Sequence, residues 1–320
     1  MQILDILNNN TATQQTDNTH GIVVYPRIHC FSLDLSKKAG FIKHGAFGFS
    51  INGLPITIKA ELSSQDNIRC NIDISSIDYL IHPDKLRENL GVTDHWQISI
   101  NCNSPLIRNH IGIGISTQIN GGAVLACARA SQVNLTINNL FQLGVGNTST
   151  LGLKLLFHPG MILETGLSNE TQPSTIVYDF ADFPFFSIVA IPKQFLSISG
   201  DLENSFYDSI LPDPANVSDE IAYEVFEKMI PATVEQRFEA FLGAMNNICR
   251  LGTKPVEESI QPEIVTKELA RLRSLFGFAA VSSMGPTIYS FSVTNPSQAL
   301  KALSTQHFEY LVFPPRRQNA

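Results

Sequence analysis

The chain has 320 residues and a net charge of −7, from 22 lysines and arginines against 29 aspartates and glutamates. At roughly 150 residues per domain, this length predicts about two domains, each large enough to bury a core. Apolar residues make up 43% of the chain, which argues against disorder. The acidic balance argues against a general nucleic-acid binder, because such binding needs a basic field. The acidic balance of the whole chain does not exclude a small basic pocket for a phosphorylated metabolite.

The sequence predicts a cytoplasmic protein that does not enter a membrane. No stretch approaches the roughly 18 consecutive apolar residues of a membrane span. Residues 1–5 lack the basic and apolar regions of a signal peptide. The five cysteines include no Cys-x-x-Cys pair, so we expect reduced core thiols rather than disulfides or a zinc site.

The first part of the chain is rich in predicted strands. Residues 1–20 are polar over most of their length and predict a flexible or irregular arm. Asn52-Gly53 is typical of a hairpin turn between two strands. A helix of small residues is predicted over residues 119–130, although Gly121 and Gly122 weaken it. Strands are predicted, from β-branched and aromatic residues, over residues 22–25, 28–35, 47–51, 56–62 and 97–101.

A second, more helical unit is predicted to begin at residue 183. Residues 185–191 predict a buried strand that Pro192 ends, and Ser218 is predicted to cap a helix with an acidic first turn. Apolar residues from Val234 to Met245 indicate another helix face. Further elements are a helix after Pro262, strands at 279–281, 287–293 and 308–313, and a helix at 296–303. Together these elements predict two α+β layers.

The stretch from His110 to Gln118 is the best candidate for binding an anion. Its glycines let the backbone approach a ligand, and hydroxyls and free N–H groups at the start of the following helix can hold phosphate oxygens. The alternative is a plain turn with glycines for tight packing, and the stretch is not a Walker A loop. The candidate binding residues are Gly112, Gly114, Ser116, Thr117 and Gln118.

Two other loops carry similar residues. Residues 143–152 repeat the glycine and hydroxyl pattern, and the candidates there are Gly146, Thr148 and Ser149. Residues 282–287 lie between two predicted strands and could line a pocket floor. The alternatives are a hydroxyl-rich loop and an ordinary β-turn with proline. The candidates in this third loop are Ser282, Ser283, Gly285 and Thr287.

Three polar residues alternate in the strand that precedes Gly45. A strand places residues two apart on one face, so Arg27 and His29 are predicted to project together. Arg27 can bind a phosphate with two hydrogen bonds, and its loss should leave the stability of the ligand-free protein almost unchanged. Asp34 completes the candidate catalytic set. The alternative is a surface arginine beside a partly buried histidine.

In this order, the motifs resemble those of the β-ribofuranosylaminobenzene 5′-phosphate synthases, an offshoot of the GHMP kinase superfamily. Residues 27–49 are similar to the A-R-L-H…D…G-G-x-G-L opening of that family. Residues 110–118 are similar to its H-x-G-L-G-S-G-T-Q loop. Residues 146–166 resemble its second loop and the G-F-I-L-D-G-G strand.

The resemblance continues in the second half of the chain. Residues 183–192 look like the family's D-F-P…V-x-I-P strand, and residues 200–206, 250–252 and 282–289 match in the same order. The likeness covers roughly residues 22–293. One departure is that Val145 and Asn147 stand where the family has an Arg-Gly pair.

The resemblance implies an α+β, GHMP-kinase-like fold of two domains. Residues 21–182 would form a domain like domain 2 of ribosomal protein S5, and residues 183–320 a ferredoxin-like domain. It also implies a phosphoribosyltransferase, with Mg²⁺, that joins C1 of 5-phosphoribosyl 1-pyrophosphate to an aromatic carboxylic acid such as 4-aminobenzoate. Carbon dioxide and pyrophosphate leave. Such a step belongs to methanopterin biosynthesis or to the formation of a related C-nucleoside, and we expect a homodimer.

Two other functions stay open. An ATP-dependent small-molecule kinase would keep the parent superfamily's chemistry, but such kinases carry a T-G-x-G-G-G-G segment where this chain has Ser282-Ser283-Met284-Gly285-Pro286. A homologue that binds ligands without catalysis is suggested by the missing cation of the second loop. In neither case do we expect a nucleic-acid or membrane partner.

Overall fold

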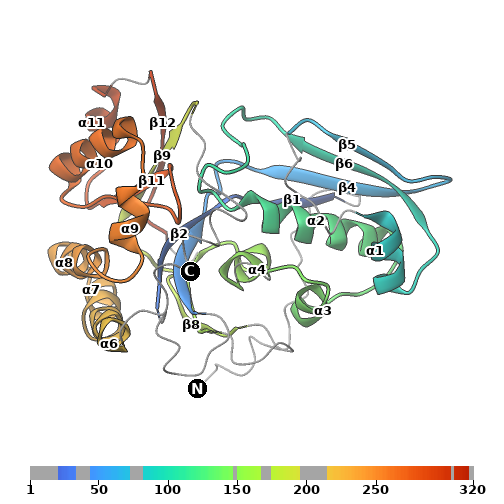
Figure 1. Ribbon diagram of the computed structural model, residues 1–320, viewed down its shortest axis with the longest axis horizontal. Coiled ribbons are helices and arrows are strands. Elements are labelled where there is room, and N and C mark those ends of the chain that lie inside the picture. The colour runs from blue at the N-terminus through green and yellow to red at the C-terminus, as the bar shows by residue number, and fades with distance from the viewer. Residues whose placement is uncertain are drawn as a thin grey trace.

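The computed structural model describes residues 21–33, 44–72, 82–146, 150–166, 174–194, 215–303 and 306–316. Within these residues the strands form three sheets of four strands each. Figure 1 shows two of the sheets with the helices α1 to α4 in one part of the molecule, and the third sheet with the later helices at the other end. The predicted mixture of sheet and helix is confirmed.

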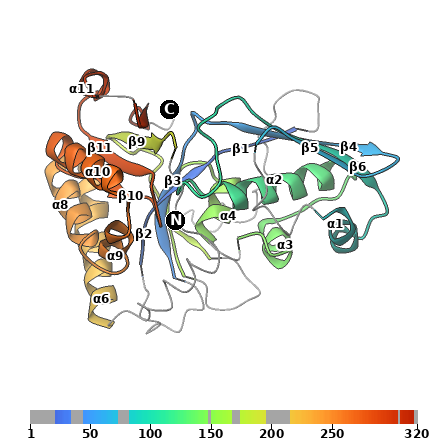
Figure 2. The same cartoon turned by 45° about the horizontal axis from the view of Figure 1, so that its top comes forward.

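The first sheet has the order β1-β4-β6-β5. In this sheet β5 and β6 form a parallel pair, and the other neighbouring strands are antiparallel. The helix α2 (Ile115–Ala130) lies along this sheet in both views (Figures 1 and 2). A Cβ on Gly122 would be 2.6 Å from Ile58 Cδ1, so the glycine that weakens the helix lets it pack closely. The strands are β1 (Gly21–Val24), β4 (Ile56–Ser63), β5 (Asn67–Cys70) and β6 (His95–Cys102).

The second sheet is antiparallel and has the order β2-β3-β7-β8. The predicted hairpin at Asn52-Gly53 is wrong, because the strands on either side of this turn belong to different sheets. Ile51 N–H donates to the carbonyl of Pro26 just where the chain crosses from one sheet to the next. The strands are β2 (Arg27–Ser32), β3 (Ala46–Ser50), β7 (Met161–Glu164) and β8 (Ile176–Asp179). Helix α4 (Thr150–Phe157) packs on this sheet, α3 (Ile137–Gln142) contacts α4, and α1 (Pro83–Leu90) lies at the far end of the first sheet (Figure 1).

The third sheet, in the order β10-β11-β9-β12, is also antiparallel. Its strands are β9 (Phe186–Pro192), β10 (Ala280–Val281), β11 (Ile288–Ser292) and β12 (Phe308–Phe313). The helices beside it are α6 (Ala215–Tyr223), the π-helix η1 (Glu224–Met229), α7 (Ile230–Val234), α8 (Phe238–Ile248), α9 (Lys254–Ser259), α10 (Glu263–Phe276) and α11 (Ser297–Lys301). Gly277 ends α10 with a φ of 75°, as predicted.

Three local predictions in this part are wrong. Strand β9 includes Pro192, which pairs with Phe308 at the strand end, where one missing N–H costs little. Ser218 lies inside α6, because the helix already begins at residue 215. Val234 does not belong to the apolar face of α8: it ends α7, and 62% of its surface is exposed.

Aromatic side chains join the two halves of the molecule. The ring centroids of Phe49, on β3, and Phe291, on β11, are 6.3 Å apart, and Phe183 lies 5.5 Å from Phe291. The largest apolar cluster contains side chains from both sides of residue 183. The domain boundary at 182/183 therefore stays a prediction, while the second and third sheets share one core.

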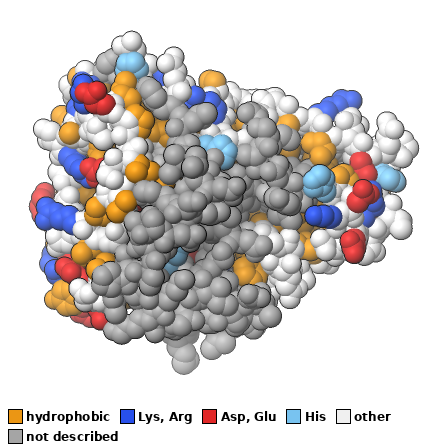
Figure 3. Space-filling model, viewed as in Figure 1, with side chains coloured by type: hydrophobic (Ala, Val, Ile, Leu, Met, Phe, Trp, Pro, Cys, Tyr) orange, Lys and Arg blue, Asp and Glu red, His pale blue; other side chains and the backbone are white. Residues whose placement is uncertain are grey.

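On the face seen in Figure 3, the described acidic and basic side chains alternate and form no extended basic surface. No helix in the described part of the chain has both the length and the apolar character needed to cross a bilayer. Figure 2 shows the same arrangement of sheets from a second direction.

Candidate functional site

Strand β2, the loop before α2 and the loop between β10 and β11 meet at one place. The N–H of Arg27 donates to the carbonyl of Ile113 at 2.8 Å, and the N–H of His29 donates to Ser282 Oγ at 3.0 Å. Ser282 Oγ in turn donates to the carbonyl of Gly112 at 2.6 Å. The structure thus brings together three segments that are up to 253 positions apart in the sequence.

The third loop is bonded to the other two segments on both sides. Thr287 Oγ1 donates to the carbonyl of Ile111 at 2.5 Å, and the N–H of Ser283 donates to the carbonyl of His29 at 3.2 Å. A Cβ on Gly112 would lie 2.7 Å from the carbonyl oxygen of Ser282, and φ at Gly112 is +82°. Glycine at position 112 is therefore required by the contact between the two loops.

Arg27 packs against the glycine loop before α2 and against Gly152, which the sequence placed in the second loop and the structure places in α4. Arg27 is 8% exposed. A Cβ on Gly114 would lie 2.8 Å from the guanidinium carbon, and one on Gly152 would lie 3.2 Å from Nε. The sequence predicted that the space beside Gly114 receives a ligand phosphate. In the structure the Arg27 side chain lies in that space, and a ligand phosphate beside Gly114 stays a prediction.

The start of α2 faces the same place. Gly114 is the N-cap residue with a φ of 51°, and no side chain caps the helix. Ser116 is half-buried, whereas Thr117 and Gln118 are buried. Gln118 Nε2 donates to the carbonyl of Gly152 at 2.6 Å, while its Oε1 has no hydrogen-bond partner within the described residues. The first N–H groups of a helix and an amide oxygen without a partner are suited to a polar ligand.

His29 is a neutral group in this site. It is 8% exposed, and its Nδ1 has no hydrogen-bond partner in the described structure. Burial, followed by the positive charges of Arg27 and Lys254, lowers the pKa of His29 well below its usual value. The sequence suggested a histidine that titrates near neutral pH. The structure instead indicates an uncharged ring that donates or accepts a hydrogen bond.

Glu164 is a buried carboxyl that the sequence analysis missed. It ends β7 with no exposed surface, and Thr150 Oγ1 donates to its Oε1 at 2.9 Å. Burial raises the pKa of Glu164 to about 8, although neighbouring hydroxyls and the charges of Lys154 and Arg27 lower it. Burial also lowers the pKa of the Lys154 ammonium. The sequence feature that could have revealed Glu164 is its position as a charged residue directly after the apolar residues 161–163.

Glu164→Gln should flatten the dependence of stability on pH. The pKa of about 8 in the folded protein exceeds the value of about 4.3 for an unfolded chain. The folded state therefore binds more protons between these values. The stabilising contribution of the protonated Glu164 carboxyl to the free energy of unfolding is complete below about pH 4. It is lost as pH rises to about 8, by at most about 1.4 kcal/mol per pH unit. Urea unfolding at several pH values measures it.

The matched control for this prediction is Glu263→Gln, because the Glu263 side chain at the start of α10 is 80% exposed. The control should leave the slope of stability against pH close to that of the wild type. An equally steep slope in the Glu164 variant would show that this carboxyl does not carry the effect.

Helix α9 supports the third loop through a second buried group that the sequence analysis missed. Lys254 Nζ donates to the carbonyl of Val281 and to Glu257 Oε2, both at 2.7 Å. Thr253 Oγ1 donates to the other oxygen of Glu257 at 2.6 Å. Gln261 Nε2 donates to the carbonyl of Met284 at 2.9 Å. The loop is therefore held from behind by buried, hydrogen-bonded groups.

Some predicted site residues cannot be placed in this arrangement. Asp34, Thr148 and Ser149 lie outside the described residues. Gly146 has a φ of +88° at the end of the described part of the second loop, and Gly285 has a φ of +62° beside Gln261. All these residues stay predictions as ligand contacts.

The described residues do not form a metal cage. Within them, no group of three or more His, Cys, Asp or Glu side chains is placed to hold a metal ion. Within the described residues, Glu164 acts electrostatically with Arg27, and burial raises the pKa of this carboxyl to about 8. The Mg²⁺ implied by the resemblance stays a prediction.

Three curated proteins match this chain over most of its length. Beta-ribofuranosylphenol 5'-phosphate synthase of Methanocaldococcus jannaschii is 29% identical over 293 residues, which are 83% of this chain and 87% of the relative. The protein of the same name from Archaeoglobus fulgidus is 26% identical, over 84% of this chain and 86% of the relative. This chain is similar to beta-ribofuranosylphenol 5'-phosphate synthases. The resemblance seen in the motifs is thereby confirmed, whereas no protein-family model matches the chain.

Solved structures show the fold. Homoserine kinase from Cytophaga hutchinsonii superimposes with a TM-score of 0.65 at 12% identity, covering 95% of this chain and 98% of that one. Mevalonate kinase from Methanococcus jannaschii gives a TM-score of 0.63 at 13% identity, covering 95% of this chain and all of the other. The chain therefore has the α+β fold of the GHMP kinases, as the resemblance implied.

Proposed function

We propose that this chain is a decarboxylating phosphoribosyltransferase that joins 5-phosphoribosyl 1-pyrophosphate to an aromatic carboxylic acid. The observation that supports it best is the meeting of Arg27 with the glycine loop and the third loop, in a chain similar to three beta-ribofuranosylphenol 5'-phosphate synthases. A site built of a cation, glycines, hydroxyls and helix N–H groups suits a diphosphate.

Arg27 and the start of α2 would bind the pyrophosphate of the donor. The Arg27 guanidinium supplies positive charge, and Ser116 and Thr117 supply hydroxyls beside the free N–H groups of the helix. The Oε1 of Gln118 has no protein partner in the described residues and can accept a bond from a ribose hydroxyl. Neutralising the leaving pyrophosphate is the main help that such a reaction needs.

The acceptor that the relatives' names favour is a hydroxybenzoate rather than 4-aminobenzoate. The names of all three specify a ribofuranosylphenol, in which the ring carries a hydroxyl. Since the proposed reaction replaces a carboxylate by the ribosyl carbon, a phenol product requires a hydroxybenzoic acid. His29 is a buried neutral ring whose Nδ1 has no hydrogen-bond partner among the described residues, and it would accept or donate the hydrogen bond that orients this acid.

The proposed reaction needs no covalent enzyme intermediate. The bond from C1 of the ribose to pyrophosphate breaks, and pyrophosphate takes the electron pair. The ring carbon that carries the carboxylate attacks C1. The bond to the carboxylate then breaks, its electron pair restores the aromatic ring, and carbon dioxide leaves. The protein positions the two reactants and stabilises the departing charge. The broader setting, in methanopterin or C-nucleoside biosynthesis and as a homodimer, stays part of this proposal.

Thermal unfolding should separate the candidate functions. A ligand that binds only the native state raises the melting temperature, by the equivalent of about 2.7 kcal/mol at a hundred times its Kd. We expect stabilisation by 5-phosphoribosyl 1-pyrophosphate with Mg²⁺ and none by ATP. With 4-hydroxybenzoate present, carbon dioxide and pyrophosphate should appear in equal amounts.

Other outcomes would contradict the proposal in different ways. Stabilisation by ATP, with ADP formed from a small alcohol, would indicate the kinase whose fold this chain shares. Stabilisation by the phosphoribosyl donor without product from either aromatic acid would indicate a homologue that binds its ligand without catalysis. Product from 4-aminobenzoate alone would overturn the choice of acceptor.

A further inference from the structure

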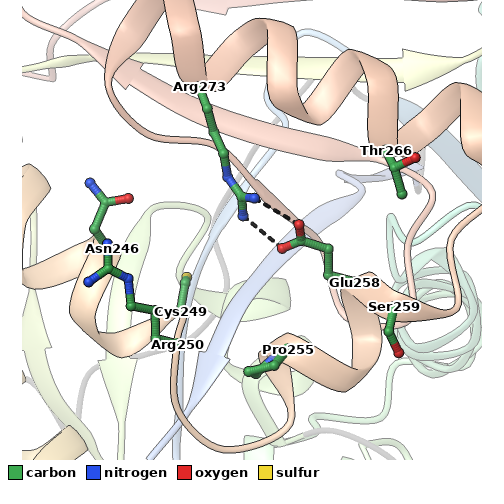
Figure 4. Close-up of a pocket in the computed structure, with 8 residues that line it drawn as sticks. All are labelled: Asn246, Cys249, Arg250, Pro255, Glu258, Ser259, Thr266 and Arg273. Carbon is green, nitrogen blue, oxygen red and sulfur yellow. Dashed lines mark hydrogen bonds and ion pairs between the residues drawn. The ribbon is translucent and has the colours of Figure 1, made fainter.

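A pocket of about 660 Å³ lies between α8, α9 and α10. Figure 4 shows Asn246 and Arg250 on one side of it, Glu258 and Ser259 on the other, and Arg273 reaching across from α10. Its volume is that of a typical small-molecule site, for which about 300–1,000 Å³ is usual.

The pocket carries a net positive charge. Arg273 forms two hydrogen bonds with the carboxylate of Glu258, both at 2.7 Å, so these two charges cancel. Arg250 is exposed and forms no ion pair within the described residues. Asn246 adds an amide whose Nδ2 donates one N–H to the carbonyl of Gly277 and keeps a second N–H, whereas Ser259 and Thr266 donate their hydroxyls to the carbonyls of Val256 and Glu263. A guanidinium with hydrogen-bond donors around it recognises an oxyanion such as a phosphate or carboxylate.

Helix α9 separates this pocket from the candidate site and contacts both. Pro255, Glu258 and Ser259 face the pocket. Lys254 and Glu257, on the other side of the helix, form the buried pair that holds the third loop. Arg273 adds a second link, because its Nε donates to the carbonyl of Ala279, directly before β10.

We propose that the pocket between α8, α9 and α10 is a second binding site, for a small metabolite with a phosphate or carboxylate group. Arg250 binds the oxyanion, and the spare N–H groups of Arg273 and of Asn246 complete the contact. The ligand acts on the phosphoribosyl site through α9, the residue Gln261 that follows it, and Arg273, which together hold the segment from Ala279 to Met284. Only this coupling, and not the binding itself, rests on the proposed function.

Alkylation of Cys249 tests the binding, because this half-buried thiol lines the pocket. Burial raises the pKa of Cys249, so the reaction with iodoacetamide is run at alkaline pH and located by mass spectrometry of peptides. The probes are glucose 6-phosphate, a phosphate monoester, and citrate, a carboxylate. At roughly ten times the Kd, the better probe should slow alkylation about tenfold, since only empty pockets react. Cys70, on β5, is the internal control.

Arg250→Ala should remove this protection, while Arg271→Ala should keep it. Arg271 is a 43% exposed arginine of α10 that is not in the pocket lining. Protection by glucose 6-phosphate alone would identify a phosphate ester, and protection by citrate alone a carboxylate. No protection by either probe, or equal protection in Arg250→Ala, would overturn the site.

The coupling is tested by titrating pyrophosphate calorimetrically with and without the protecting probe. We expect the affinity for pyrophosphate to change about fivefold or more in the wild type and not in Arg250→Ala. An unchanged affinity in the wild type would overturn the coupling. If pyrophosphate fails to bind the wild type at all, the proposed function fails, whereas the protection of Cys249 still decides whether the pocket binds an oxyanion.

Discussion

Arg27→Ala should weaken the binding of pyrophosphate and of 5-phosphoribosyl 1-pyrophosphate by roughly ten- to a hundredfold. The reason is the loss of a charge-assisted contact from a side chain that is 8% exposed and lies between Gly114 and Gly152. Isothermal titration of the ligand-free protein with pyrophosphate measures the effect. Arg27→Lys should recover part of the affinity, because an ammonium keeps the charge but not the forked geometry of the guanidinium.

The same substitution should also lower stability, by about 1–3 kcal/mol. The sequence alone suggested almost no change, as for an arginine that projects into a cleft. The structure revises this, because Arg27 fills the space between Gly114, at the start of α2, and Gly152, in α4. Arg69→Ala is the matched control, since Arg69 is an exposed arginine of β5 in another sheet, and it should change neither property.

The two measurements on Arg27→Ala separate its roles. A loss of stability with an unchanged affinity for pyrophosphate would make Arg27 a packing residue only. The donor would then have to be held by the loops and by the N-terminus of α2 alone.

Gly114→Val should abolish donor binding and destabilise the fold at the same time. A Cβ at this position would lie 2.8 Å from the Arg27 guanidinium, closer than the two groups can approach. In addition, φ at Gly114 is +51°, and a β-branched residue is strained there by about 1–3 kcal/mol. Valine would therefore push Arg27 out of place and distort the start of α2. Urea unfolding and pyrophosphate titration measure the two effects.

The control for this prediction is Gly243→Ala in α8. No atom lies within 4 Å of a Cβ built there, and the residue is exposed in a helix. Alanine should raise stability by about 0.5–1 kcal/mol and leave donor binding alone. If Gly114→Val binds pyrophosphate with normal affinity, the glycine loop is not part of the donor site.

Local sequence patterns predicted many elements, and failed where a partner distant in the sequence decides the structure. The apolar run at 308–313 is strand β12, and the pattern from Pro262 to Gly277 is helix α10. The turn at Asn52-Gly53 looks like a hairpin in the sequence because it has the same two residues as a typical hairpin turn. Whether the flanking strands pair depends on other strands: β3 pairs with β2 and β7, and β4 with β1 and β6.

The candidate site was predictable where residue type carries the signal. Glycines, hydroxyls and an arginine indicated three loops, and the structure brings Arg27, Gly112 and Ser282 together. Glu164 and Lys254 were not predicted. Apart from the apolar residues that precede Glu164, nothing beside them in the sequence shows that they are buried. Burial is what shifts the pKa of Glu164 and makes the pair of Lys254 with Glu257 hold a loop.

The sequence by itself determined the α+β class, the positions of most strands and helices, and the likeness to one synthase family, because these depend on local patterns and on residue order. Only the tertiary structure decided that His29 is neutral and that Arg27 occupies the space beside Gly114. It also showed that one short helix, α9, lies between a positively charged pocket and the candidate site. These properties arise from burial and from contacts across long sequence separations, which no local pattern encodes.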